Sequence, residues 1–197
     1  MIGVAVVLSG CAYFASAPPE NVSLRPAPSR LPTYTVSGQT IFATPGPINV
    51  AVQPLVPEEV HRYFRSRPSR VNPFQEMGDK ITPFFVRIEN RSKDQVAFDP
   101  GGAILKDNED RPFGALGVTD LYDMFGDRQA LLQAALKGVF VSYVIVLPQK
   151  SREGLLVFPA FPKDAEALFL QFTSLYAGPT PYPLIFEFTV VPEESKE

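Results

Sequence analysis

A chain of 197 residues, 45% apolar and 20% charged, has the composition of a globular protein with one ordinary domain or two small ones. Its 21 prolines and 16 phenylalanines, without tryptophan, favour short strands and loops over long helices. The 21 acidic and 18 basic residues give a net charge of −3, which lacks the basic excess of nucleic-acid-binding proteins. A single cysteine excludes an internal disulfide. We therefore expect a mainly β domain that does not bind nucleic acid.

The beginning of the chain has the pattern of an export signal. Residues 2–8 are apolar or glycine, and two small residues follow before Cys11. This run is far shorter than the roughly 20 residues that a membrane-spanning helix needs. Because no lysine or arginine precedes it, we expect translation to start upstream of Met1. Residues 1–10 are predicted to be a signal peptide that is shortened at its start.

The residues Leu8-Ser9-Gly10-Cys11 resemble the lipobox of bacterial lipoproteins. The resemblance implies that the Cys11 thiol receives a diacylglyceryl group, that cleavage occurs before it, and that the new amino terminus is acylated, for example with palmitate. Several buried acyl chains hold a protein stably on a bilayer, whereas one chain does so only marginally. An aspartate after the cysteine is similar to an inner-membrane retention signal in Gram-negative bacteria. Ala12 stands there, so the resemblance implies the outer membrane, with the lipid bilayer as a partner of acylated Cys11.

A proline-rich segment follows the cysteine. Residues 11–32 contain five prolines and no periodic apolar pattern: Pro18, Pro19, Pro26, Pro28 and Pro32. Such a segment extends by roughly 3.1 Å per residue where it adopts the polyproline conformation. We predict that residues 11–32 form a tether, that residues 33–192 form the folded domain, and that residues 193–197 are an acidic tail.

Beyond the tether, short apolar runs are separated by proline, glycine and aspartate, which predicts strands. The expected strands are residues 33–42, 48–53, 80–90, 95–99, 103–106, 139–147, 155–158, 168–175 and 184–191. Pro83 indicates that its strand begins late or lies at a sheet edge.

Two regions have helical spacing instead. Residues 57–65 begin with a proline suited to the first helical position, acids follow in the first turn, and apolar residues recur at i, i+3 and i+4. Residues 118–136 have apolar spacings of three and four, with Gly126 between two short helices and Gly138 at the end of the second.

Eight or nine short strands and one helical insertion predict an all-β fold, a β-sandwich rather than an open sheet. The block FFVRIENRSKDQVAFDPGGAILKDNEDRPF resembles the immunoglobulin-like domains of bacterial surface lipoproteins, and GLLVF at residues 154–158 resembles a strand of the same families. This resemblance spans about residues 80–191 and implies an immunoglobulin-like β-sandwich with a short helical insertion. Those families mostly lack a known activity.

Residues with catalytic or metal-binding chemistry are sparse. His61 is the only histidine, and the arginines around it supply no acid that would orient an imidazole. One cysteine and one histidine, fifty positions apart, cannot form a zinc site. Residues 107–110 offer oxygen ligands in one turn, so calcium is an alternative to a plain β-turn. We expect no catalytic residue, no bound metal and no cofactor.

Positive charge is concentrated in the segment HRYFRSRPSR at residues 61–70, which contains Arg62, Arg65, Arg67 and Arg70. Arginine binds phosphate and carboxylate groups through two parallel hydrogen bonds. The segment predicts an anion- or partner-binding patch for lipid headgroups, lipopolysaccharide or an acidic protein. The alternative is an ordinary exposed helix end and loop.

The sequence leaves three classes of function open. The first is a non-enzymatic lipoprotein of the bacterial envelope, anchored at Cys11, whose β-sandwich binds another envelope or secreted component. The second is a structural or assembly accessory subunit of an envelope complex. The third is a hydrolase with a carboxylate site that no motif marks.

Overall fold

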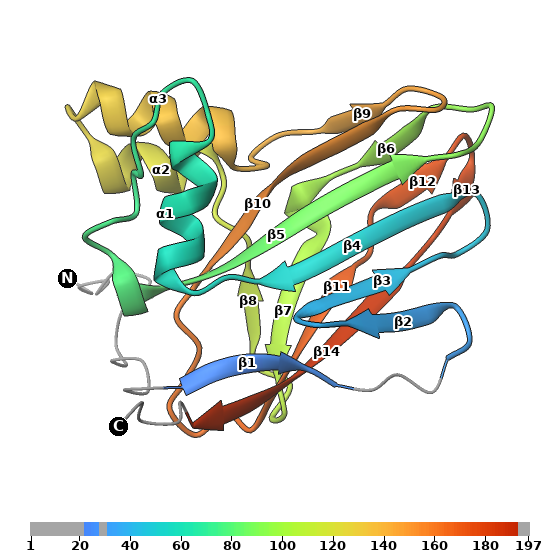
Figure 1. Ribbon diagram of the computed structural model, residues 1–197, viewed down its shortest axis with the longest axis horizontal. Helices are drawn as coiled ribbons and strands as arrows, with labels where there is room; N and C mark the ends of the chain where they lie inside the picture. Colours follow the sequence, from blue (N-terminus) through green and yellow to red (C-terminus); the bar gives the residue numbers. More distant parts are fainter. Residues whose placement is uncertain (1–21, 28–30, 193–197) are drawn as a thin grey trace, which may run out of the picture.

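The computed structural model describes residues 22–27 and 31–192. Within these residues the chain forms two large antiparallel sheets, a smaller third sheet and three α-helices gathered at one end (Figure 1). The predicted all-β sandwich with a short helical insertion is confirmed. Cys11, the predicted signal peptide, part of the predicted tether and the acidic tail lie outside the described residues.

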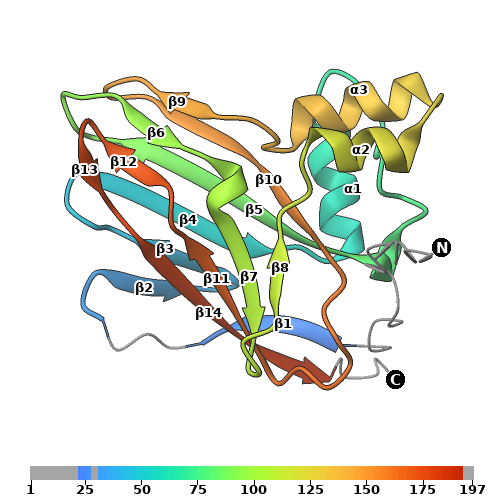
Figure 2. The same cartoon turned by 180° about the vertical axis from the view of Figure 1, so that it is seen from behind.

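One large sheet has the strand order β1-β14-β11-β7-β8 and lies in front when the molecule is seen from behind (Figure 2). Buried and exposed residues alternate along its central strands, because one face packs on the core and the other meets solvent. Its strands are β1 (Val22–Pro26), β7 (Ala103–Asp107), β8 (Pro112–Gly114), β11 (Ala167–Phe172) and β14 (Leu184–Pro192).

The opposite sheet has the order β10-β5-β4-β3-β2, and the third sheet has the order β13-β12-β6-β9. The strands of the opposite sheet are β2 (Tyr34–Ser37), β3 (Thr40–Ala43), β4 (Ile48–Pro54), β5 (Ile81–Asn90) and β10 (Ser151–Pro159). Those of the third sheet are β6 (Val96–Phe98), β9 (Val144–Val146), β12 (Leu175–Ala177) and β13 (Thr180–Pro181). Between the sheets lies a core rich in fully buried phenylalanine: Phe84, Phe98, Phe158, Phe172, Phe186 and Phe188. Burying each such side chain contributes about 1.5–3 kcal/mol.

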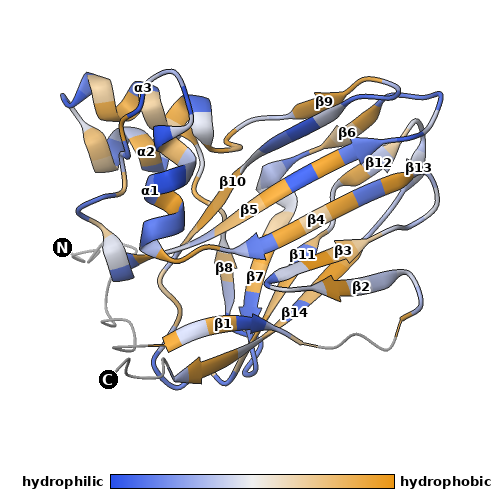
Figure 3. Ribbon diagram, in the orientation of Figure 1, coloured by the Kyte–Doolittle hydropathy of each residue, from blue (hydrophilic) through white to orange (hydrophobic). Residues whose placement is uncertain are grey.

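The helices form a second core on the outer face of the β10-β5 part of the sheet. They are α1 (Pro57–Arg65), α2 (Val118–Phe125) and α3 (Gln129–Gly138), as the apolar spacing predicts. Leu155 and Val157 of β10 pack among the helices, whereas Leu156 and Phe158 face the sandwich core. The apolar segments of the helices and strands are coloured orange in Figure 3. Two short 3-10 turns, Gly78–Lys80 and Pro100–Gly102, precede β5 and β7.

Three strand predictions are corrected by the structure. Residues 33–42 form the β2–β3 hairpin rather than one strand, because Gly38 adopts a φ of 59° in the turn. In the predicted strand 139–147 only β9 is a strand, since the chain crosses from the end of α3 to the third sheet. The predicted strand 168–175 is broken between β11 and β12.

Pro83 lies in β5, which is paired on both sides and is not an edge strand. Its carbonyl accepts a hydrogen bond from the Leu55 backbone N at 2.9 Å, directly after β4 ends at Pro54. The N–H that proline lacks would point to this same side, where the regular pairing stops. A proline is therefore tolerated near the start of a central strand.

Residues 22–26, predicted to belong to the tether, form β1 instead. They pair with β14 from Val22 opposite Pro192 to Pro26 opposite Phe188. Val22 and Leu24 pack against the sandwich core. The Ala27 backbone N donates to the Glu187 carbonyl, and this register turns the nitrogen of Pro26 away from β14, so the proline interrupts no ladder bond.

We predict that Gly138→Ala destabilises the domain by about 1–3 kcal/mol, the usual cost of overpacking a core. A Cβ at this position would overlap with the ring of fully buried Phe64, with Cζ only 2.9 Å away. Urea unfolding monitored by circular dichroism would measure the loss. Gly114→Ala is the matched control, because a Cβ there meets nothing within 4 Å. Equal midpoints for the two variants would contradict the close approach of α3 to Phe64.

Candidate functional site

The four arginines of the predicted patch have different surroundings. Arg62 and Arg65 are exposed on α1, and Arg70 is exposed in the loop beyond it, with a φ of 51°. Arg67 is half-buried: its guanidinium carbon lies 4.0 Å from the ring centroid of Tyr63, and one terminal nitrogen lies 3.4 Å from Glu153. Arg67 therefore packs within the domain, which leaves the other three arginines as the exposed members of the patch.

Tyr63 links this segment to the helical end of the molecule. Its hydroxyl donates a hydrogen bond of 2.7 Å to the carbonyl of Gly138 at the end of α3. Burial raises the pKa of Tyr63 to about 12, because a phenolate would lose its hydration. The neutral form thus holds α1 against α3 over the physiological pH range.

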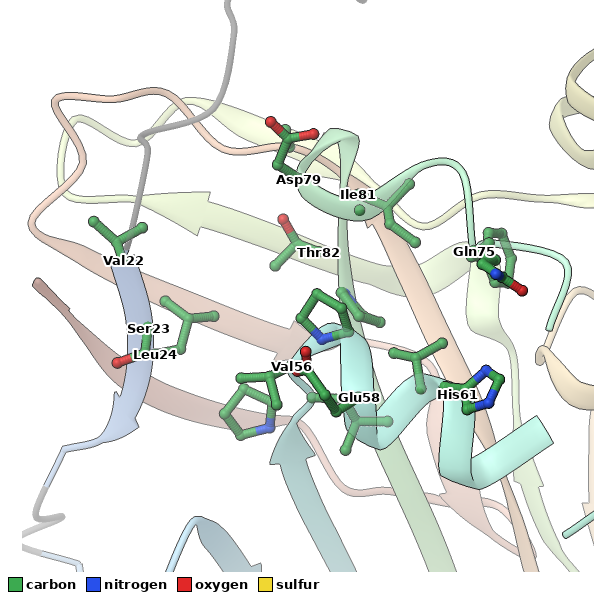
Figure 4. A pocket seen from close by; sticks show the side chains of 18 of the residues that line it. Val22, Ser23, Leu24, Val56, Glu58, His61, Gln75, Asp79, Ile81 and Thr82 are labelled. Carbon is green, nitrogen blue, oxygen red and sulfur yellow. The ribbon is translucent and has the colours of Figure 1, made fainter. Parts of the chain in front are cut away.

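A cleft of about 520 Å³ lies between β1 and the beginning of α1. Figure 4 shows Val22, Ser23 and Leu24 of β1 on one side and Val56, Glu58 and His61 on the other. Four separate segments meet here, and most of the lining is apolar: Val22, Leu24, Pro54, Leu55, Val56, Pro57, Val60, Phe74, Ile81, Pro83, Ala160 and Phe161. The volume and the apolar lining are typical of a ligand-binding cleft.

The cleft exists because regular pairing ends around it. β4 stops at Pro54, and Pro57 begins α1 two residues later, so the chain turns away from the sheet. The Glu59 carboxylate accepts a hydrogen bond of 3.2 Å from the Val56 backbone N, which fixes the first turn of α1. Buried Val60 and Phe64 anchor the helix in the second core. Its first turn is therefore held in place on the side of the cleft opposite β1.

Charged and polar side chains lie among the apolar ones. Glu58 and Asp79 are both exposed, and no lysine or arginine belongs to the described lining. His61 also lines the cleft, but no hydrogen bond within residues 22–27 and 31–192 joins it to a hydroxyl or a carboxylate. The cleft therefore combines an apolar lining with two acidic side chains, Glu58 and Asp79, which we call its rim.

The cleft is close along the chain to the predicted lipid anchor. Val22, on its wall, is eleven residues after Cys11. Because an extended chain spans at most about 3.6 Å per residue, the cleft wall lies within about 40 Å of the cysteine. A lipid-anchored chain would thus carry this cleft near the bilayer surface.

The acidic turn at residues 107–110 has partners within the protein. The buried Asp107 carboxylate accepts hydrogen bonds from the backbone N of Glu109 and of Arg111 and pairs with the Arg111 side chain. Arg111 also bonds to Asp164 and holds the pKa of that carboxyl below its usual range. Within the described ranges no group of three or more histidine, cysteine, aspartate or glutamate side chains is arranged to hold a metal ion.

A second exposed feature lies on the third sheet. The strand register places Tyr176, Ala97 and Ile145 side by side across β12, β6 and β9. Tyr143 and Leu147, at alternate positions from Ile145, are 60% and 51% exposed. These five residues form what we call the apolar row.

Comparisons with known proteins identify no family. No family model matches the chain, and no curated protein matches it. Among solved structures it is similar to the yjhA protein from Bacillus subtilis, with 12% identity, a TM-score of 0.38, and coverage of 83% of this chain and 98% of the other. It is also similar to Northeast Structural Genomics Consortium target SoR45, with 10% identity, a TM-score of 0.37, and coverage of 79% and 93%. These likenesses carry no argument about function. No helix in the described part of the chain is long and apolar enough to cross a membrane.

We predict that the domain loses stability between about pH 10 and 12 through Tyr63. An unfolded tyrosine ionises near pH 10, whereas folded Tyr63 keeps its proton up to a pKa of about 12. A raised folded pKa stabilises the fold below pH 10, and this contribution disappears as the pH rises through 12. Urea unfolding at pH 9 and 11.5 should show a smaller pH effect for Tyr63→Phe than for the parent. Identical pH effects would contradict the buried position of the hydroxyl.

Proposed function

We propose that this chain is a lipoprotein of the bacterial envelope, anchored through acylated Cys11, whose β-sandwich binds another envelope or secreted component in the cleft beside β1 and α1. It acts by binding rather than by catalysis. The observation that carries the proposal is the apolar cleft. Val22, which lines it, follows the predicted lipobox cysteine by eleven residues.

The anchor and the binding surface have separate roles in this proposal. Multiple acyl chains keep a protein at the membrane, and they specify no partner. The cleft supplies a rigid, mainly apolar surface that can exclude water from a partner side chain. Because the tether is short, partners within a few nanometres of the bilayer would be favoured. Ala12 supports the outer membrane as the location in a Gram-negative host.

Intact-mass measurement tests the anchor. The natural gene with its upstream sequence should yield a chain that begins at Cys11 and carries the added mass of a diacylglyceryl group and an amide-linked fatty acid. Cys11→Ser should keep the unprocessed mass and carry no acyl group. A mature chain without added acyl mass would refute the anchor.

A structural accessory subunit is the second candidate, and the apolar row favours it. Exposed aromatic and aliphatic side chains in register on one sheet face are typical of a surface that a permanent neighbour covers. Co-purification in mild detergent separates the candidates. A fixed assembly partner should appear at a constant ratio, whereas a transiently bound component should be lost on dilution.

The exposed arginines give a separate prediction. Charge reversal of Arg62, Arg65 and Arg70 to glutamate should reduce sedimentation of the Cys11→Ser chain with vesicles of anionic lipid by at least threefold, because the local field changes sign. Lys106→Glu, Lys137→Glu and Lys163→Glu together provide a control of equal charge change. Equal binding by both triple variants, or none by the parent, would exclude a specific role for the arginine segment.

A further inference from the structure

β1 is an edge strand among the described residues, and three of its residues line the cleft. Among the described residues β1 pairs only with β14. The hydrogen bond from the Ala27 backbone N to the Glu187 carbonyl fixes which residues of β1 bond to β14. The backbone N–H and C=O groups of Ser23 and Arg25 therefore face β14. The backbone N–H and C=O groups of Val22 and Leu24 then point the other way, to the side of β1 that has no partner strand among the described residues, and both residues also belong to the cleft lining.

An unpaired edge beside an apolar cleft is suited to one kind of occupant. An extended peptide can add to a strand edge through main-chain hydrogen bonds while its alternate side chains enter pockets. Here the main-chain groups of Val22 and Leu24 would supply the bonds. The apolar lining of Leu24, Val56, Ile81 and Phe161 would receive side chains that point inward at every second position.

The charges of the cleft distinguish between apolar occupants. Glu58 and Asp79 border it without a lysine or arginine in the described lining. A fatty acid or a phospholipid would bring a carboxylate or phosphate against these two acids, which is unfavourable. A lysine or arginine next to the inserted apolar residues would instead be attracted to them. Charge complementarity therefore favours a basic peptide over a lipid.

We propose that the cleft binds an extended segment of a partner protein, which adds as a strand to the free edge of β1, inserts alternate apolar side chains, and places a lysine or arginine beside Glu58 and Asp79. This inference rests on the proposed function, since it specifies the component that the β-sandwich binds.

Peptide selection tests the inference directly. The probe is a library of random 12-residue peptides displayed on phage, selected against the Cys11→Ser chain, followed by titration of the enriched peptides in synthetic form. Recovered sequences should alternate apolar residues and contain a lysine or arginine. Methylation of alternate main-chain nitrogens should weaken binding at least tenfold in one register and little in the other, because only one set faces β1.

Variants at the rim supply the matched comparison. Glu58→Gln with Asp79→Asn should weaken the selected peptide at least tenfold and remove the preference for a basic residue. Glu166→Gln with Glu187→Gln changes the net charge equally at exposed sites outside the cleft lining and should leave the affinity unchanged. All four side chains are exposed, so the thermal unfolding of each variant should match that of the parent.

Several outcomes would overturn the inference. These are selection of no peptide, enriched peptides without a basic residue, binding that survives methylation in both registers, or displacement of the peptide by anionic lipid at equal affinity. Binding that appears only after residues 12–21 are replaced by glycine and serine would assign the cleft to the chain's own amino-terminal segment. If a co-purified partner remains bound to the Glu58→Gln, Asp79→Asn variant, the proposed function stands and this inference fails.

Discussion

One sheet of this protein is buried on both faces at one end, and the rest of the architecture depends on that constraint. Along β10, Leu156 and Phe158 enter the sandwich core, while Leu155 and Val157 lie under the helices. Because side chains alternate with a period of two, a shift of one residue in register would exchange the two sets completely. The register of β10 with β5 therefore fixes where both cores lie and where the helices can pack.

The position of the cleft follows from this arrangement. Phe64 anchors α1 in the second core, against Gly138 at the end of α3 and beside Tyr63. The other end of α1 then borders the cleft, which β1 also lines. Prolines at the end of β4, at the start of α1 and near the start of β5 end the regular pairing at the same place: Pro54, Pro57 and Pro83. The same features that close the second core thus keep the cleft open.

The arginine segment shows how tertiary structure divides the roles of residues that look equivalent in sequence. Its helical part follows from local spacing, and Arg62 and Arg65 are exposed on α1. Arg67 lies just past the helix, where the ring of Tyr63 and the carboxylate of Glu153 come within reach. Glu153 belongs to β10, 86 residues further along the chain. A pattern of charges within ten residues could not distinguish this structural arginine from its exposed neighbours.

Local signals by themselves determined the three helices and most of the strands of this protein. Pro57 and the apolar spacing gave the bounds of α1, and Gly126 correctly separated α2 from α3. The alternation of apolar and polar residues was sufficient to predict β14. The same alternation in Val22–Pro26 was hidden by the surrounding prolines. Only the pairing with β14 shows that the nitrogen of Pro26 points away from the ladder of hydrogen bonds.

The cleft was decided by tertiary structure alone. Leu24, Glu58 and Asp79 are on three different segments, and no spacing in the sequence relates them. The physical reason is that periodicity reports the environment of one element, whereas a site formed by several segments depends on how the cores orient those elements in space. Sequence thus predicted a lipid anchor and a β-sandwich, and the positions of α1 and β1, which both line the cleft, produced the cleft itself.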